Sequence, residues 1–175
     1  MVGGLNPLSA IKFHGENMKL KVLFICKDSA VHSLMAATFL NTHFGDRYEA
    51  CCAGIEPSKT NANAVKALQE IGIDVSRGNP KNPDELKQEK FDCVITLCDF
   101  ARANLTSLPA HKKELHKSFK NFCLPSLCEN AEKFPMCFPA PNSRCDIKKI
   151  PGDNLAAFRY LREEIFNWLE NEAVF

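Results

Sequence analysis

The sequence predicts an α/β protein in which a parallel β-sheet is covered by helices on both faces. Two observations support this class. Short apolar runs rich in branched and aromatic residues recur along the chain, and segments with helical periodicity lie between them. We expect strands within residues 19–25, 48–53 and 91–99. The third run is largely continuous in its apolar character, as burial on both faces of a sheet requires.

Length and composition are those of one ordinary globular domain. The chain has 175 residues, of which 45% are hydrophobic and 25% are charged, and its formal net charge is +1. A chain of this size buries a sufficient core unaided. The small net charge creates no field that would attract nucleic acid or an anionic membrane. No apolar run approaches the roughly 20 residues that span a bilayer. We therefore expect no nucleic-acid partner and no membrane span.

The chain divides into a short extension and one domain. Residues 1–17 are expected to form a flexible N-terminal extension, because Gly3-Gly4 and Asn6-Pro7 interrupt regular structure there. Residues 18–175 then form a single domain. The extension lacks the features of a secretory signal, and an odd number of cysteines, nine, argues against a disulfide framework. A reducing compartment, the cytoplasm, is the expected location.

Two long helices are predicted, one after the first strand and one at the end of the domain. Ser33 is the expected N-cap of a helix at residues 34–44. The closing helix spans residues 154–172 and is amphipathic. Its apolar side chains are spaced for one face: Leu155, Phe158, Leu161, Ile165, Trp168 and Leu169.

A shorter helix is predicted at residues 64–71. Asn61 or Asn63 can cap its N-terminus, and Gly72 ends it. Three apolar residues are expected to share one face of this helix: Val65, Leu68 and Ile71.

The connection between the first strand and the first helix is a candidate anion-binding loop. Cys26 ends the strand and is followed by Lys27, Asp28, Ser29, Ala30, Val31, His32 and Ser33. Backbone N–H groups converge in such a loop, and the helix dipole adds positive potential. The same potential favours the thiolate of a cysteine at the start of the loop, so Cys26 is a candidate nucleophile. The alternative is that Cys26 is an inert buried cysteine at a strand end.

These motifs resemble those of the low-molecular-weight tyrosine phosphatases, and most closely those of the thioredoxin-coupled arsenate reductases that share their fold. The pattern C-x5-H-S at residues 26–33 resembles the C-x5-R-S signature of the superfamily. Residues 52–76 resemble S-A-G-x-E-P followed by a helix and G-I-D-[IV]-S. Residues 91–98 resemble F-D-x-V-[IV]-T-L-C, and residues 158–165 resemble the closing helix of the family.

The resemblance covers roughly residues 19–121 and 153–172. It implies a three-layer α/β fold, low-molecular-weight phosphatase-like, with a four-stranded parallel sheet in the order 2-1-3-4. The fourth strand would lie within residues 108–121. Residues from about 123 to 150 are then an insertion rich in cysteine and proline.

The resemblance also implies roles for individual residues. Cys26 would be the nucleophile, and Cys98 would be a second thiol that attacks it. The family's third cysteine falls on Leu105. His32 takes the place of the family's arginine, whose fork binds two oxygens of the anion. One imidazole donor cannot reproduce that fork, and the alternative to a catalytic role is that His32 fills the vacated space.

Further departures from the family lie in the loop and at the general acid. Asp28 stands where the family usually has glycine, and its carboxylate would repel a dianion. Ser29 replaces an asparagine that shapes the loop. The general-acid aspartate falls on Asn121 or, in another register, on Ala140. Neither residue can donate a proton as a carboxylic acid does.

Three functions are therefore open. The first is a non-catalytic binding or regulatory module with a degenerate active site. The second is an active arsenate reductase or protein tyrosine phosphatase that uses Cys26 as its nucleophile. The third is a thiol redox protein in which Cys26 and Cys98 form a reversible disulfide. The expected ligand is a small oxyanion, such as phosphate, sulfate or arsenate, at the Cys26 loop, and the candidate protein partner is thioredoxin-like. No cofactor is expected.

No metal site is expected. Four cysteines lie in or beside the insertion, at Cys123, Cys128, Cys137 and Cys145. They are separated by four, eight and seven residues, unlike the C-x2-C pairs of common zinc sites. Their spacing leaves open whether they bind metal or form disulfides. Three histidines fit no ligand spacing and are expected to be surface or structural residues: His43, His111 and His116.

Overall fold

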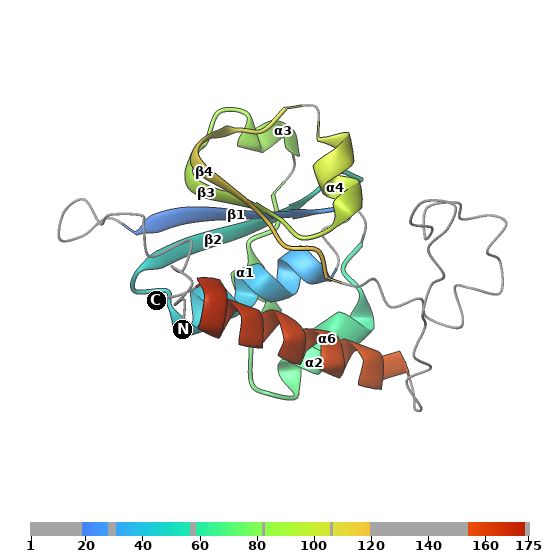
Figure 1. Ribbon diagram of the computed structural model, residues 1–175. Coiled ribbons are helices and arrows are strands. Elements are labelled where there is room, and N and C mark those ends of the chain that lie inside the picture. The colour runs from blue at the N-terminus through green and yellow to red at the C-terminus, as the bar shows by residue number, and fades with distance from the viewer. Residues whose placement is uncertain are drawn as a thin grey trace, which may run out of the picture.

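The computed structural model describes residues 19–27, 31–56, 59–81, 83–105, 107–119 and 154–173. These residues form a layered α/β unit (Figure 1). The predicted extension at residues 1–17 and the predicted insertion at about 123–150 lie outside the described residues. The domain boundaries therefore stay predictions.

A parallel sheet of four strands lies at the centre of the described chain. The strands are β1 (Leu20–Cys26), β2 (Tyr48–Gly54), β3 (Lys90–Thr96) and β4 (Ala110–His116). Their order is β2-β1-β3-β4, and every pair is parallel. The predicted fold class and sheet order are confirmed. The third strand is shorter than predicted, because the chain leaves the sheet after Thr96 and Cys98 already caps the next helix.

The inner strands β1 and β3 carry the core. Leu23 and Phe24 point to opposite faces of β1, and both are fully buried. Val94 and Ile95 do the same on β3. Each such side chain contributes about 1.5–3 kcal/mol by leaving water. Burial on both faces explains why these two runs of sequence are apolar without alternation.

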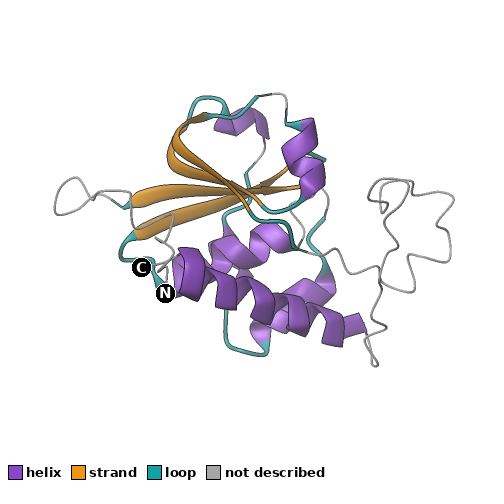
Figure 2. Ribbon diagram, in the orientation of Figure 1, coloured by secondary structure: helices purple, strands orange, loops and turns teal. Residues whose placement is uncertain are grey.

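Helices cover both faces of the sheet (Figure 2). On one side lie α1 (His32–His43), α2 (Ala62–Gln69) and α6 (Asn154–Trp168), with α6 packed against α1 and α2. On the other side lie α3 (Pro83–Leu86) and α4 (Asp99–Asn104). Two short helical segments complete the described elements, the 3-10 turn η1 (Val75–Gly78) and the π-helical end η4 (Leu169–Ala173).

The prediction that Ser33 caps the first helix is wrong. α1 begins at His32, and the residue before it, Val31, makes no capping bond with its side chain. Ser33 lies within the first turn and is 0% exposed. The helix begins two residues earlier than predicted, and each residue of helix rotates a side chain by about 100°, so the Ser33 hydroxyl points to the core instead of capping the helix.

The shorter helix is capped as predicted, but Ile71 does not lie on its apolar face. The Asn61 side chain accepts a hydrogen bond from the Asn63 amide at 2.9 Å, which confirms Asn61 as the N-cap. Gly72 adopts a positive φ of 74° just beyond the helix, as a stop requires. Ile71, however, is 44% exposed. The helix ends at Gln69, so Ile71 has already left the helical face that points to the core.

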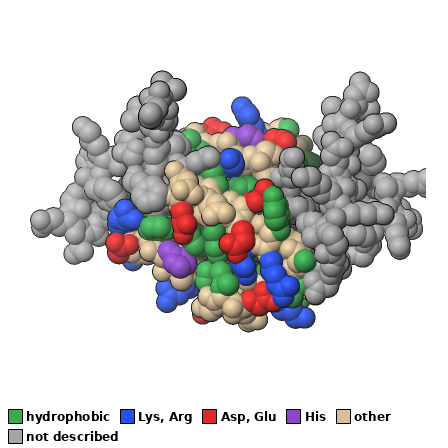
Figure 3. All heavy atoms as spheres, turned by 60° about the horizontal axis from the view of Figure 1, so that its bottom comes forward, with side chains coloured by type: hydrophobic (Ala, Val, Ile, Leu, Met, Phe, Trp, Pro, Cys, Tyr) green, Lys and Arg blue, Asp and Glu red, His purple; other side chains and the backbone are tan. Residues whose placement is uncertain are grey.

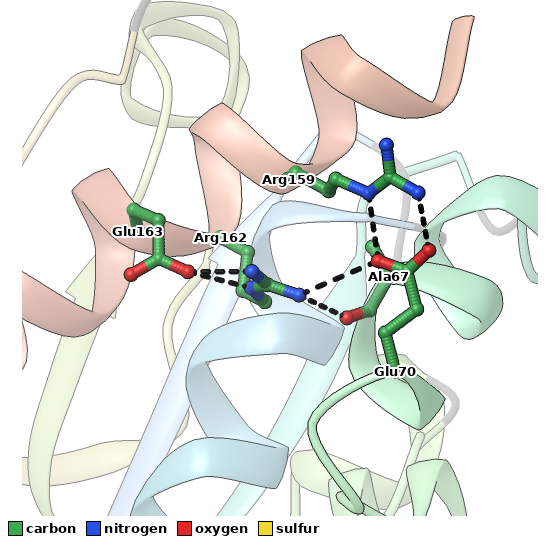
Figure 4. Close-up of polar contacts among 5 residues, drawn as sticks. All are labelled: Ala67, Glu70, Arg159, Arg162 and Glu163. Carbon is green, nitrogen blue, oxygen red and sulfur yellow. Dashed lines mark hydrogen bonds and ion pairs between the residues drawn. The ribbon is translucent and has the colours of Figure 1, made fainter.

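Two arginines of α6 attach it to α2 (Figure 4). Arg159 donates two hydrogen bonds to the Glu70 carboxylate, and this pairing holds the pKa of Glu70 below its usual range. Arg162 is only 8% exposed and donates to the Ala67 carbonyl oxygen and to the Glu163 carboxylate. A buried guanidinium needs such partners to offset its loss of hydration. These contacts therefore fix where the closing helix lies.

The face of the molecule on the side of α2 and α6 carries charges of both signs (Figure 3). Acidic and basic side chains are interspersed there around small apolar areas, in keeping with the net charge of +1. This face thus presents no strong field of one sign. Within the described ranges, no helix combines the length and the apolar character needed to cross a membrane.

Buried thiols on the strands make the folded state sensitive to alkaline pH. Burial raises the pKa of Cys51, Cys52 and Cys93 from an ordinary value of 9.0 to about 12. Between those pH values the unfolded chain loses thiol protons that the folded chain retains. The free energy of unfolding therefore falls as the pH rises from about 9 to about 12, and the contribution is intact below pH 9.

We predict that Cys93→Ala makes this alkaline loss of stability less steep. One thiol accounts for about 1.4 kcal/mol per pH unit between its two pKa values. The cavity lowers stability equally at all pH values, so only the slope reports the thiol. Urea unfolding between pH 7 and 11 measures it for both proteins. Identical slopes would contradict the burial effect assigned to Cys93.

Candidate functional site

Cys26 lies at the carboxyl end of β1, beneath the start of α1. Its side chain is 1% exposed, and its Sγ lies 3.3 Å from the Ser33 hydroxyl oxygen. The Ser33 hydroxyl also donates to the Ala53 carbonyl oxygen on β2 at 3.4 Å. The predicted nucleophile and the serine that follows the loop are therefore brought together, although the serine does not act as a helix cap.

The first part of the predicted loop is attached to the end of β2. The amide of Glu56 donates to the Lys27 carbonyl oxygen at 2.8 Å, and the amide of Ile55 donates to the Cys26 carbonyl oxygen at 3.1 Å. The Lys27 amine lies 3.9 Å from the Glu56 carboxylate and 5.3 Å from the centre of the Phe100 ring. Lys27 is thus half-buried and engaged with its neighbours.

Three residues of the predicted loop, Asp28, Ser29 and Ala30, lie outside the described residues, so their expected effects on an anion stay predictions. Val31, which follows them, is partly buried and packs against the core.

His32 is part of an aromatic cluster. Its ring stacks on Phe119, with ring centres 6.5 Å apart and planes inclined by 27°. Phe119 in turn meets Trp168 edge to face at 5.6 Å. His32, which takes the place of the arginine expected from the resemblance, is therefore connected through Phe119 to Trp168 of the closing helix α6.

Cys98 lies at the same edge of the sheet as Cys26. It is the N-cap of α4, is 4% exposed, and its sulfur accepts a hydrogen bond from the Ala101 amide at 3.4 Å. The preceding residue, Leu97, donates its amide to the Ile25 carbonyl oxygen at 2.8 Å. A direct backbone hydrogen bond thus joins the two residues that precede Cys26 and Cys98 in the sequence.

Other positions implied by the resemblance fall differently. Leu105 is partly buried at the end of α4 and supplies no third thiol. Asn121 and Ala140, the two candidate positions for a general acid, lie outside the described residues. So do Cys123 and the other cysteines of the predicted insertion.

A polar network beside Cys98 was not foreseen from the sequence. His116, at the end of β4, contacts the Thr96 hydroxyl at 2.8 Å and the Asp99 carboxylate at 3.0 Å. Ser118 donates to the other oxygen of Asp99 at 3.0 Å. A usable signal existed, because side chains that follow neighbouring parallel strands meet at one edge of the sheet.

Metal-binding groups are not clustered in the part of the chain that the structure describes. No three His, Cys, Asp or Glu side chains there are placed to hold a metal ion. Cys51 and Cys52 are buried and form no disulfide, which is typical of packing residues.

Comparison with known proteins identifies the family. The family described as low molecular weight phosphotyrosine protein phosphatase matches residues 21–132. The chain belongs to this family. Among solved structures, an arsenate reductase in the phosphate binding state has a TM-score of 0.58 at 23% identity, covering 88% of this chain and 95% of that one. A low molecular weight protein tyrosine phosphatase from T. tengcongensis has a TM-score of 0.55 at 20% identity, covering 87% and 97%. These two likenesses concern the fold.

Sequence relatives are named arsenate reductases. The protein of Halalkalibacterium halodurans is 36% identical over 101 residues, which cover 58% of this chain and 73% of that protein. The protein of Bacillus licheniformis is 34% identical over 120 residues, covering 69% and 84%. The predicted resemblance to the arsenate reductase branch is confirmed.

We predict that Ser33→Ala slows the reaction of Cys26 with iodoacetamide at pH 7–8 by roughly twofold to tenfold. The Ser33 hydroxyl can turn from Ala53 to donate to the thiolate, and a typical hydrogen bond contributes about 0.5–1.5 kcal/mol, which corresponds to about twofold to tenfold in rate. Peptide mapping by mass spectrometry gives the rate for Cys26. The exposed Ser76→Ala variant is the matched control and should react like the wild type. An equal rate in the Ser33 variant would show that this hydroxyl does not assist the thiolate.

Proposed function

We propose that the chain is a non-catalytic member of the family, a binding or regulatory module that retains the Cys26 loop without the groups needed for turnover. The environment of His32 carries the proposal. Its ring is engaged in stacking on Phe119, which itself packs against Trp168. A side chain used for aromatic packing does not replace an arginine that grips an anion in front of the thiol.

The chemistry expected of the family supports this proposal, because it needs groups that the loop is proposed to lack. Attack by the Cys26 thiolate would form a bond from sulfur to phosphorus or arsenic while the bond to the leaving oxygen breaks. The charge on the transferring group needs strong donors, and loss of one such donor costs about 10²–10³ in rate. The leaving oxygen needs a proton, and loss of the general acid costs about 10²–10⁴. The carboxylate of Asp28 would add repulsion.

A small oxyanion, such as phosphate, sulfate or arsenate, is the proposed ligand, held by the backbone of the loop at residues 27–33. Support comes from the family and from the strand, loop and helix order at Cys26. A thioredoxin-like protein is the proposed partner of the thiols. The proposed location is the cytoplasm, because the odd number of cysteines, nine, argues against a disulfide framework.

We predict negligible turnover of p-nitrophenyl phosphate by the unmodified protein. This substrate needs little help from a general acid, because its leaving group is stable as an anion. It still needs charge stabilisation, so loss of the arginine fork should suppress its hydrolysis. The double variant Asp28→Gly, His32→Arg should recover part of the activity. Release of p-nitrophenolate is the measurement.

The control adds Cys26→Ser to the double variant and should abolish the recovered activity. Calorimetry with phosphate separates binding from turnover in the same proteins. Robust turnover by the unmodified protein that depends on Cys26 would overturn the non-catalytic proposal and favour an active arsenate reductase or phosphatase.

A second candidate function is thiol redox exchange between Cys26 and Cys98. The hydrogen bond from Leu97 to Ile25 favours it, because it joins the strands immediately before the two thiols. A disulfide of a thioredoxin-like partner would be the oxidant. One thiolate attacks that disulfide to form a mixed disulfide, and the other thiol displaces the partner. The partner takes up two electrons and two protons.

We predict that a mild oxidant such as diamide forms an internal disulfide between Cys26 and Cys98 with loss of two hydrogens. Non-reducing peptide mapping identifies the bridge. Cys98→Ser should prevent it, whereas Cys93→Ser on the same strand should not. If Cys26 and Cys98 stay reduced while other cysteines oxidise, the redox candidate is excluded.

A further inference from the structure

The His116 ring contacts one residue before Cys98 and one residue after it, in the turn between β3 and α4. Its Nδ1 lies 2.8 Å from the Thr96 hydroxyl, and its Nε2 lies 3.0 Å from the Asp99 carboxylate. A carboxylate only accepts, so Nε2 carries a hydrogen, and Nδ1 of the neutral ring accepts from Thr96. In the imidazolium, Nδ1 donates to the same hydroxyl, which then donates to the Leu115 carbonyl oxygen at 3.4 Å. Both contacts therefore exist in either protonation state.

Other bonds join the same two stretches of chain. Within residues 116–119, two amides donate to the carbonyl oxygens of residues 96 and 97, at 2.9 and 3.2 Å. Ser118 donates to the second oxygen of Asp99. The backbone hydrogen bonds hold the residues that precede Cys98 in the sequence, whereas the side-chain contacts hold Asp99, the residue that follows it.

We propose that His116 is a positioning residue that holds the Cys98 turn in place by binding Asp99, an inference that rests on the proposed role of Cys98 as a thiol partner. An exposed ion pair contributes little by itself, and the Asp99 side chain is 82% exposed. His116, however, is only 19% exposed and is already oriented by Thr96. Holding Asp99 therefore orders one side chain rather than two.

The same segment also reaches the Cys26 side of the site. Phe119 follows Ser118 and stacks on His32, the first residue of α1. Residues 116–119 thus contact the chain that flanks each of the two thiols. Loss of the His116 contact should loosen the Cys98 turn, while the stacking on His32 persists.

Alkylation of Cys98 by N-ethylmaleimide tests the proposal, because a buried thiol reacts only when its surroundings open. His116→Phe keeps the ring volume and removes both contacts. His116→Gln retains a donor near the position of Nε2, and His116→Asn retains one near Nδ1. We expect the Phe and Asn variants to raise the rate at Cys98 about fivefold, the factor given by about 1 kcal/mol, and the Gln variant to react like the wild type.

Two controls separate positioning from general destabilisation. His111 lies on β4, like His116, and its exposed ring contacts the Pro109 carbonyl oxygen. The His111→Gln variant should therefore leave the alkylation rate of Cys98 unchanged. Alkylation of Cys93, measured in the same digests, reports opening of β3 itself and should not change. An unchanged Cys98 rate in the Phe variant, equal rates in the Gln and Asn variants, or a parallel rise at Cys93 would overturn the proposal. Alkylation does not require a disulfide between Cys26 and Cys98. Failure of the proposed redox exchange is therefore detected by the diamide experiment and not by this assay.

Discussion

The hydrogen bond from the Leu97 amide to the Ile25 carbonyl oxygen is the constraint on which the site depends. It joins the inner strands at their carboxyl ends, where parallel strands of an α/β sheet present their loops. Cys26 follows Ile25 directly in the sequence, and Cys98 follows Leu97. The pairing of two buried strands thus determines that two cysteines more than 70 residues apart share one edge of the sheet.

Most of the fold follows from local sequence pattern. Residues of β1 and β3 must be buried on both faces, and that demand leaves an apolar run that is visible in the sequence. Local chemistry also limited the cap to Asn61 or Asn63, of which the structure has Asn61, and identified Gly72 as a stop, because such residues act on the backbone next to them. The errors were of helix phase. Ser33 and Ile71 were placed at helix boundaries, but the observed helices begin at His32 and end at Gln69, and a shift of one or two residues turns a side chain to another face.

The site was predicted less completely than the fold, since much of it is made by contacts distant in sequence. The position of Cys26 could be found from the strand, loop and helix order alone. The interaction of His116 with Asp99 spans 17 residues and two elements, and no periodicity encodes it. The stacking of His32 on Phe119 is likewise a tertiary contact. Family membership supplies the fold and the position of the thiol, whereas activity depends on such particular side chains.

Trp168 gives the protein a built-in optical reporter. It is the single tryptophan of the chain, is 7% exposed, and packs edge to face on the ring that stacks on His32. Indole emission responds to the polarity and order of its surroundings. The wavelength and intensity of intrinsic fluorescence should therefore follow rearrangement at the beginning of α1, so that ligand or partner binding near the thiols can be titrated without any attached dye.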